Sequence, residues 1–141
     1  MAWYDTAVFY HIYPLGLCGC AHENDGQPTP GAFAKLNAWA EHASKDLGCT
    51  AIYIGPLFES GSHGYDTIDY RRVDRRLGTN EDLKTVCDAF HQAGIRVMLD
   101  GVYKQANESL TINKEADHAR IHDVFISHPK RYFHELCLLI I

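Results

Sequence analysis

The sequence contains no long apolar run, and this absence limits where the protein can reside. Its longest apolar stretch, residues 136–141, falls far short of the roughly 20 residues that a membrane helix needs, so we expect no membrane span. The opening MAWYD lacks the basic start and the apolar segment of a signal peptide, which predicts a cytoplasmic location. Cysteine is sparse and odd in number, at five, so we expect mostly free thiols.

Positive charge is also in short supply. The 13 Lys and Arg residues are outnumbered by 18 Asp and Glu residues, and the net charge of -5 argues against nucleic acid or an anionic membrane as the main partner. The 141 residues, 46% of them hydrophobic, suffice for one domain with a core. A complete eight-fold β/α barrel takes about 200 residues or more, so we expect no complete barrel here.

Strand and helix patterns alternate along the first hundred residues. Short strands rich in β-branched and aromatic residues are expected over residues 7–13, 50–54 and 95–99. Apolar residues recur three or four apart over residues 33–47, which predicts a first helix ending at Gly48. A second helix is expected to begin at Thr79 or Asn80 as N-cap and to end at Gly94.

The order strand, helix, strand, helix, strand predicts an α/β fold with a parallel sheet and right-handed crossovers. Both strand-to-helix loops are long and both helix-to-strand loops are nearly absent, which favours a site at the carboxyl ends of the strands. A doubly wound nucleotide-binding sheet needs a glycine fingerprint in a tight first turn, and the sequence has none. We therefore predict the N-terminal three β/α units of a TIM-type barrel, incomplete.

Three stretches of this region carry motifs with a defined order and spacing. They are residues 7–14 (AVFYHIYP), residues 54–83 with the segments IGPLFES, HGYDTIDY and LGTNEDL, and residues 94–103 (GIRVMLDGVY). Together they resemble the N-terminal part of the catalytic barrel of the α-amylase family of glycoside hydrolases, over roughly residues 3–103. This resemblance implies the same barrel that the loop lengths favour.

The resemblance implies a retaining enzyme that cleaves α-glucosidic bonds in starch or maltodextrin, so an α-glucan is the implied partner. Such a reaction needs a nucleophilic carboxylate and an acid/base carboxylate about 5 Å apart. In the family these groups follow the fourth and fifth strands, with a third carboxylate after the seventh, and none of them has a counterpart here. We therefore expect no catalytic residue in this chain, and interpret it as a truncated, inactive glycosidase.

Substrate-binding residues are implied by the resemblance at two positions. Tyr65, in HGYD, matches the family's tyrosine that stacks on the sugar, and an aromatic face suits the C–H face of a pyranose. Taken without the resemblance, Tyr65 is more simply a loop residue packed under Phe58. Asp100 matches the aspartate of the family's first conserved region, which helps to organise the active site. The alternative for Asp100 is a purely structural hydrogen bond to a neighbouring loop.

The sequence changes character after Gly101. All eleven glycines lie at or before this position, and Lys104 and Gln105 replace the asparagine and histidine that the family has four and five residues after Asp100. Because lysine cannot ligate a cation, we expect no calcium at this position. We also expect no other metal site and no cofactor. We divide the chain into a barrel part, 1–103, and a divergent tail, 104–141, for which a frameshift, a deletion or a misjoined gene model is our hypothesis.

Further groups in the chain have simpler interpretations. In the tail, a helix over 115–127 would place His118 and His122 on one side, where surface histidines are the default over a metal site, and 136–141 is either a strand or an apolar tail. The basic cluster contains Arg71, Arg72, Arg75 and Arg76, with Asp69 and Asp74 interleaved. We interpret this cluster as a solvated, internally paired loop rather than an anion site.

Two other functions remain open at this point. One is a small non-catalytic α/β maltodextrin-binding module whose tail supplies a helix and a strand that close the sheet. The other is a small self-sufficient hydrolase using Asp66 or Asp100, or a carboxylate pair drawn from Glu59, Asp66 and Asp69, whose separation the spacing does not fix. As a barrel fragment the chain would leave two open sheet edges, which predicts self-association.

Overall fold

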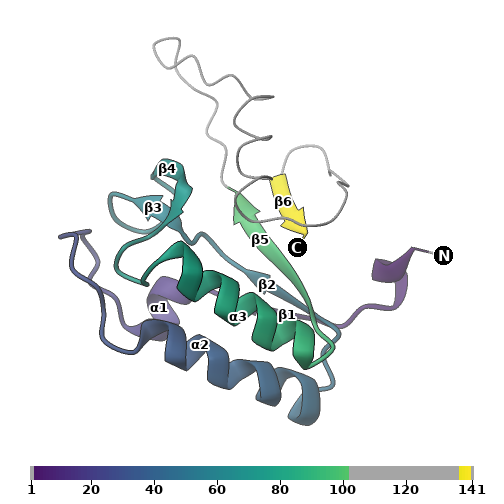
Figure 1. Cartoon of the computed structure of the whole chain (residues 1–141). Coiled ribbons are helices and arrows are strands. Elements are labelled where there is room, and N and C mark those ends of the chain that lie inside the picture. The colour runs from purple at the N-terminus through teal and green to yellow at the C-terminus, as the bar shows by residue number, and fades with distance from the viewer. Residues whose placement is uncertain (1, 102–136, 141) are drawn as a thin grey trace.

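The computed structural model describes residues 2–101 and 137–140 and shows one mixed sheet covered by helices, with a separate hairpin (Figure 1). The sheet has the strand order β1-β2-β5-β6, formed by β1 (Phe9–Ile12), β2 (Ala51–Ile54), β5 (Arg96–Gly101) and β6 (Cys137–Ile140). The helices are η1 (Trp3–Thr6), α1 (Pro14–Cys18), α2 (Ala32–Glu41), η2 (His42–Asp46) and α3 (Asn80–Gln92), and the hairpin is β3 (Phe58–Ser60) with β4 (Thr67–Val73).

The first three strands of the sheet are parallel, as the sequence predicts. Phe9 pairs with Ala51, and Ala51 with Arg96, so β1, β2 and β5 run in register from one end of the sheet to the other. The fourth strand differs, because β6 pairs with β5 in the antiparallel sense, with Asp100 opposite Leu138. Residues 136–141 were expected to form either a strand or an apolar tail, and the described part of this range, 137–140, is a strand.

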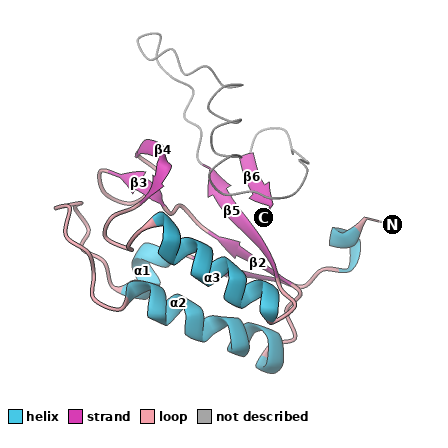
Figure 2. Ribbon diagram, in the orientation of Figure 1, coloured by secondary structure: helices cyan, strands magenta, loops and turns pink. Residues whose placement is uncertain are grey.

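Both long helices cover the same face of the sheet (Figure 2). Side chains alternate along a strand, and the set that faces the helices is apolar and buried. From the sheet this set contains Ile12, Ile52, Ile54, Val97 and Leu99, and from the helices Phe33, Leu36, Ala40, Leu83, Val86 and Phe90. The alternate set, which includes Phe9, His11 and Tyr53, lies on the opposite face, and this second face holds the candidate site.

The start of α3 follows the sequence signal closely. Thr79 is the N-cap, its hydroxyl accepts the amide of Asp82 at 3.2 Å, and the Asp82 carboxylate accepts the Thr79 amide at 2.9 Å. This reciprocal pair is a capping box and satisfies amides that a helix start leaves without partners. The α-helix α2 ends at Glu41 and continues as the π-helical turn η2. Leu47, the last residue of the apolar pattern that predicts this helix, follows η2 and is 43% exposed.

Both long loops contain secondary structure that the sequence patterns do not predict. Pro14 ends the first strand and then serves as the first residue of α1, a position where its missing N–H costs nothing. The second loop folds into the β3–β4 hairpin, whose register shifts at Glu59. These two elements lie at the carboxyl ends of β1 and β2 and therefore shape the surroundings of the site.

Part of the expected tail is outside the described residues. This applies to Lys104 and Gln105, to the expected helix over 115–127, and to His118 and His122. Within residues 2–101 and 137–140, every helix is too short or too polar to cross a bilayer.

Candidate functional site

The candidate site lies at the carboxyl ends of the parallel strands, on the face that the helices leave open. Tyr53 of β2 stands beside His11 of β1, with ring centroids 4.7 Å apart. The hydroxyl of Tyr53 donates to Oδ2 of Asp100 at 2.7 Å, which joins β2 to the end of β5. Three neighbouring strands thus place an imidazole, a phenol and a carboxylate together.

Asp100 has one satisfied oxygen and one that is not. The residue is only 4% exposed, and its Oδ1 is buried without a hydrogen-bond partner among the described residues. Burial raises the pKa of Tyr53, and the hydrogen bond and charge of Asp100 raise it further, so this phenol stays a donor at neutral pH. A buried carboxylate oxygen without a hydrogen-bond donor is costly in free energy.

Tyr65 is exposed, at 48%, rather than packed under Phe58 as the simpler interpretation expects. Its amide donates to Nδ1 of His63 at 3.2 Å, which holds its backbone while the ring remains accessible. Burial raises the pKa of both Tyr13 and Tyr53, and the nearby charge of Tyr65 adds to each shift. Tyr65 therefore lies near the two tyrosines that stand at the ends of β1 and β2.

The segment that carries Tyr65 is fixed by polar contacts on both sides. The hydroxyl of Tyr13 donates to the carbonyl of His63 at 2.9 Å, and that of Ser62 donates to Oδ2 of Asp66 at 2.9 Å. Nδ1 of His63 lies 3.7 Å from Oδ1 of Asp66. Burial acts to raise the pKa of Asp66, but the bonds from Ser62 and the backbone, with the charge of His63, lower it overall.

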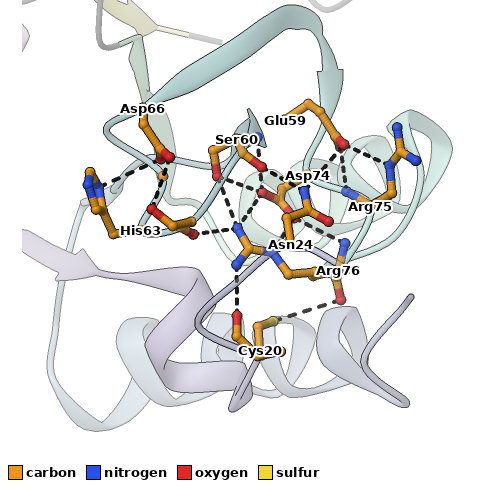
Figure 3. A network of polar contacts seen from close by, with 12 residues as sticks. Cys20, Asn24, Glu59, Ser60, His63, Asp66, Asp74, Arg75 and Arg76 are labelled. Carbon is orange, nitrogen blue, oxygen red and sulfur yellow. Dashed lines mark hydrogen bonds and ion pairs between the residues drawn. The ribbon is translucent and has the colours of Figure 1, made fainter. Parts of the chain in front are cut away.

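The arginine cluster is paired internally, as expected, but it is not solvated throughout, and that part of the interpretation is wrong. Arg76 is 1% exposed and Asp74 is fully buried, and their closest ion-pair distance is 2.7 Å (Figure 3). The hydrogen bonds that Arg76 donates to Asp74 raise the pKa of Arg76, against the opposing effect of burial. Burial is tolerated because the guanidinium finds acceptors for each of its nitrogens.

The remaining arginines behave as surface groups. Arg75 pairs with the nearly buried carboxylate of Glu59 at 2.7 Å, and Arg71 lies 3.7 Å from Asp69. With Arg72, these two arginines line an open hollow of about 560 Å³ beside the start of α3, where Asp69 and Glu81 supply opposite charge. The hollow is thus of mixed sign, which does not favour the anion-site alternative.

The carboxylates proposed for a small hydrolase have separate partners. Glu59 accepts the amide of Arg75 at 2.9 Å, Asp69 accepts that of Arg71 at 2.9 Å, and Asp66 is held by Ser62. Each group is thus committed to a structural contact of its own. Within residues 2–101 and 137–140, no three His, Cys, Asp or Glu side chains gather closely enough to hold a metal ion.

Sequence reasoning identified Tyr65 and Asp100 but missed their neighbours. Tyr13 and Tyr53 occupy the ends of their strands, and Arg76 lies beyond β4. A signal was available for Tyr13, because it stands two residues after His11 in an extended segment and so shares its side. No such signal was available for Arg76, since its partners come from two distant parts of the chain, residues 21–22 and 60–62.

The parallel strands, the helices on one face and the cluster at the strand ends define an incomplete β/α barrel. Residues 43–135 match the family described as alpha amylase, catalytic domain. The chain belongs to this family of α-amylase catalytic domains. The matched range continues beyond position 103, and the boundary between a barrel part and a divergent tail stays a prediction.

Characterised relatives support the same family. A cyclomaltodextrinase from a Bacillus species is 34% identical over 122 residues, which cover 77% of this chain and 22% of the relative. A maltogenic alpha-amylase from Bacillus acidopullulyticus is 36% identical over 118 residues, covering 74% of this chain and 20% of the relative. This chain therefore spans about a fifth of the length of these relatives.

A solved structure supports the fold. The crystal structure of a trehalulose synthase from Pseudomonas mesoacidophila superposes with a TM-score of 0.56 at 32% identity. The superposition covers 72% of this chain and 18% of the synthase. The open face of the sheet therefore corresponds to the face that looks into a barrel when all of its strands are present.

Proposed function

We propose that this chain is the N-terminal part of a glycoside hydrolase barrel, and that its own contribution is to bind an α-glucan such as maltodextrin. Tyr65 supplies the stacking surface, and Asp100 organises the site through its hydrogen bond with Tyr53. The whole enzyme would cleave α-glucosidic bonds with retention of configuration. The relatives whose names refer to cyclomaltodextrin and to maltose support this substrate class.

The observation that carries the proposal is an exposed aromatic ring on the segment that contacts Tyr13, next to the strand-end cluster of Tyr53 and Asp100. Tyr65 is 48% exposed, and Oδ1 of Asp100 has no partner among the described residues. A pyranose presents an apolar C–H face, which complements the exposed ring of Tyr65. The raised pKa of Tyr53 keeps a phenol donor next to the same carboxylate.

Titration calorimetry with a maltodextrin tests the proposal. Weak binding by the full chain should be clearly weakened, but still measurable, in Tyr65→Ala and in Asp100→Asn. The matched control is Tyr4→Ala, because Tyr4 is also an exposed tyrosine, at 39%, but lies before β1 at the opposite end of the sheet (Figure 1). Equal loss of binding in Tyr4→Ala, or unchanged binding in Tyr65→Ala, would contradict the proposal.

We expect no hydrolysis from these residues alone. A retaining glycosidase needs two carboxylates about 5 Å apart across the bond. The carboxylates near the site are engaged, Asp66 with Ser62 and Asp100 with Tyr53. Reducing-sugar release by the purified chain that disappears in Asp100→Asn would revive the small-hydrolase alternative.

A second candidate, the small maltodextrin-binding module, is favoured by one observation. β6 pairs with β5, so the tail supplies a strand to the sheet, as this alternative expects. Both candidates predict glucan binding, and they differ in what the gene encodes after position 103. Sequencing of the coding DNA from codon 95 onward, in all frames, separates them: motifs for the later barrel strands favour the truncated glycosidase.

A cytoplasmic location and self-association complete the proposal. An intracellular maltogenic amylase from Bacillus subtilis is 36% identical over 89 residues, which supports the location. The outer edge of β1 has no strand partner among the described residues, and Val8 and Phe9 beside it are exposed. Such an edge favours pairing with a second copy, which light scattering would detect as a dimer or larger species.

A further inference from the structure

We propose that Arg76 is a positioning residue for glucan binding, and that it acts by fixing the segment that presents Tyr65. This inference rests on the proposed binding role of Tyr65. Arg76 does not reach a ligand itself, because its side chain is only 1% exposed. Its effect must therefore pass through the groups that it contacts.

The guanidinium of Arg76 joins three segments that are far apart in the sequence (Figure 3). Nη1 donates to the carbonyls of Ala21 and His22, at 2.7 and 3.1 Å. Nη2 donates to the carbonyl of Ser62 at 2.6 Å and to Oγ of Ser60 at 3.0 Å. Nε and Nη2 also bond the two oxygens of Asp74, at 2.9 and 2.7 Å.

The contact with Ser62 is the one that bears on the site. Ser62 is followed directly by His63, Gly64 and Tyr65, so Arg76 holds the backbone three residues before the exposed ring. At the next residue, the hydroxyl of Tyr13 donates to the carbonyl of His63 at 2.9 Å. The segment is thus pinned by a buried cation at one carbonyl and by a strand-end phenol at the next.

The first long loop adds a second support for the same arrangement. The side-chain amide of Asn24 donates to the carbonyl of Ser60 at 2.7 Å, and its backbone amide donates to the carbonyl of Gly61 at 2.9 Å. The carbonyl of Arg76 accepts the amide of Thr29 at 2.8 Å. Arg76 therefore ties the first loop to the hairpin around the segment that carries Tyr65.

Only arginine has the geometry for this role. Its planar group offers five N–H donors in fixed directions, and each of its three nitrogens donates to an oxygen acceptor. A lysine would keep the charge near Asp74 but has a single nitrogen, so it cannot reach the Ala21 and Ser62 carbonyls together. Arg76→Lys should therefore keep much of the fold and lose part of the positioning.

The first test reads the position of Tyr65 without any glucan. The protein is labelled with 3-fluorotyrosine, and the fluorine NMR signal of Tyr65 is assigned with Tyr65→Phe. In Arg76→Gln this signal should move towards the value of free fluorotyrosine and narrow. In the matched control Arg71→Gln the Tyr65 signal should not move. The side chain of Arg71 is 59% exposed and pairs with Asp69, outside the 62–66 segment.

The second test is a double-mutant cycle on maltodextrin binding. Arg76→Gln should weaken binding roughly tenfold when Tyr65 is present, and by less than about twofold in the Tyr65→Ala background. A residue with a purely structural role would produce equal losses in the two backgrounds. Equal losses would overturn the proposal.

The two tests separate the failure of this inference from that of the proposed function. If the wild-type chain binds no maltodextrin, the glucan role fails, but a shifted Tyr65 signal in Arg76→Gln still supports the positioning role. If the signal does not move, the positioning role is wrong whatever binds. If Arg76→Gln does not fold by circular dichroism, Arg76→Lys takes its place, and an unfolded Arg76→Lys would make Arg76 a folding residue and overturn the inference.

Discussion

Removing the carboxylate of Asp74 should lower the free energy of unfolding more than breaking any exposed ion pair among the described residues. Its two oxygens accept five hydrogen bonds, two from Ser60 and three from Arg76, at 2.7 to 3.2 Å. Asp74→Ala would leave the guanidinium of Arg76 buried and without its counter-charge. Breaking a buried ion pair in this way typically costs about 3–5 kcal/mol.

That cost is large against the whole stability of a small domain, which is about 5–15 kcal/mol. Asp74→Ala should therefore lower the urea midpoint by about a fifth or more, with an unchanged slope. Arg76→Met should cost a similar amount, because it leaves the Asp74 carboxylate buried. The double variant should be less destabilised than the sum of the two, since neither charge then remains without a partner.

Urea unfolding followed by circular dichroism and tryptophan fluorescence measures these differences. Trp39 reports on the core, because its ring stacks on Tyr10 with centroids 5.3 Å apart. The control is Glu41→Gln, which breaks the exposed pair with Lys45 and should leave the midpoint unchanged. A loss below about 1 kcal/mol in Asp74→Ala, the range of exposed pairs, would refute the reasoning.

Further predictions concern single groups. Thr79→Ala removes the N-cap of α3 and should cost about 1 kcal/mol in urea unfolding. Hydrogen bonds from Thr79 hold the pKa of Asp82 below 3.8. The stability that this carboxylate contributes is therefore present above pH 3.8 and is lost as the pH falls through its folded pKa. The difference in urea midpoint between the wild type and Asp82→Asn should shrink over that range of pH. Burial raises the pKa of Cys87 to about 12, so Ellman's reagent should count as many native thiols in Cys87→Ser as in the wild type. Tyr53→Phe removes the hydrogen-bond donor of Asp100 and should cost about 1–3 kcal/mol in urea unfolding, and an unchanged midpoint would contradict this.

The elements that the sequence predicted well are those whose signals are local. α3 begins at its expected cap, and its buried stripe is the expected one, because a capping box and an apolar period lie within thirteen residues. The parallel order of β1, β2 and β5 followed from the alternation of strands and helices. The family motifs supplied Tyr65 and Asp100, which no local pattern singles out.

What the sequence could not reveal depends on contacts between distant segments. Asp74 and Arg76 are two residues apart among other charges, which is typical of a solvated loop. They are buried because the carbonyls of Ala21 and Ser62 and the hydroxyl of Ser60 converge on the guanidinium. The β3–β4 hairpin was missed for a related reason, since its irregular register blurs the alternation that predicts strands.

The antiparallel pairing of β6 has a consequence for how this piece of a barrel could be completed. In a closed β/α barrel every strand is parallel to both neighbours, so the edge of β5 would receive a parallel strand. Here β6 occupies that edge from Met98 to Gly101, in the opposite direction. A separately supplied remainder of the barrel would have to displace β6 before it could dock, so reconstitution from two fragments should proceed faster with a chain that ends before residue 137.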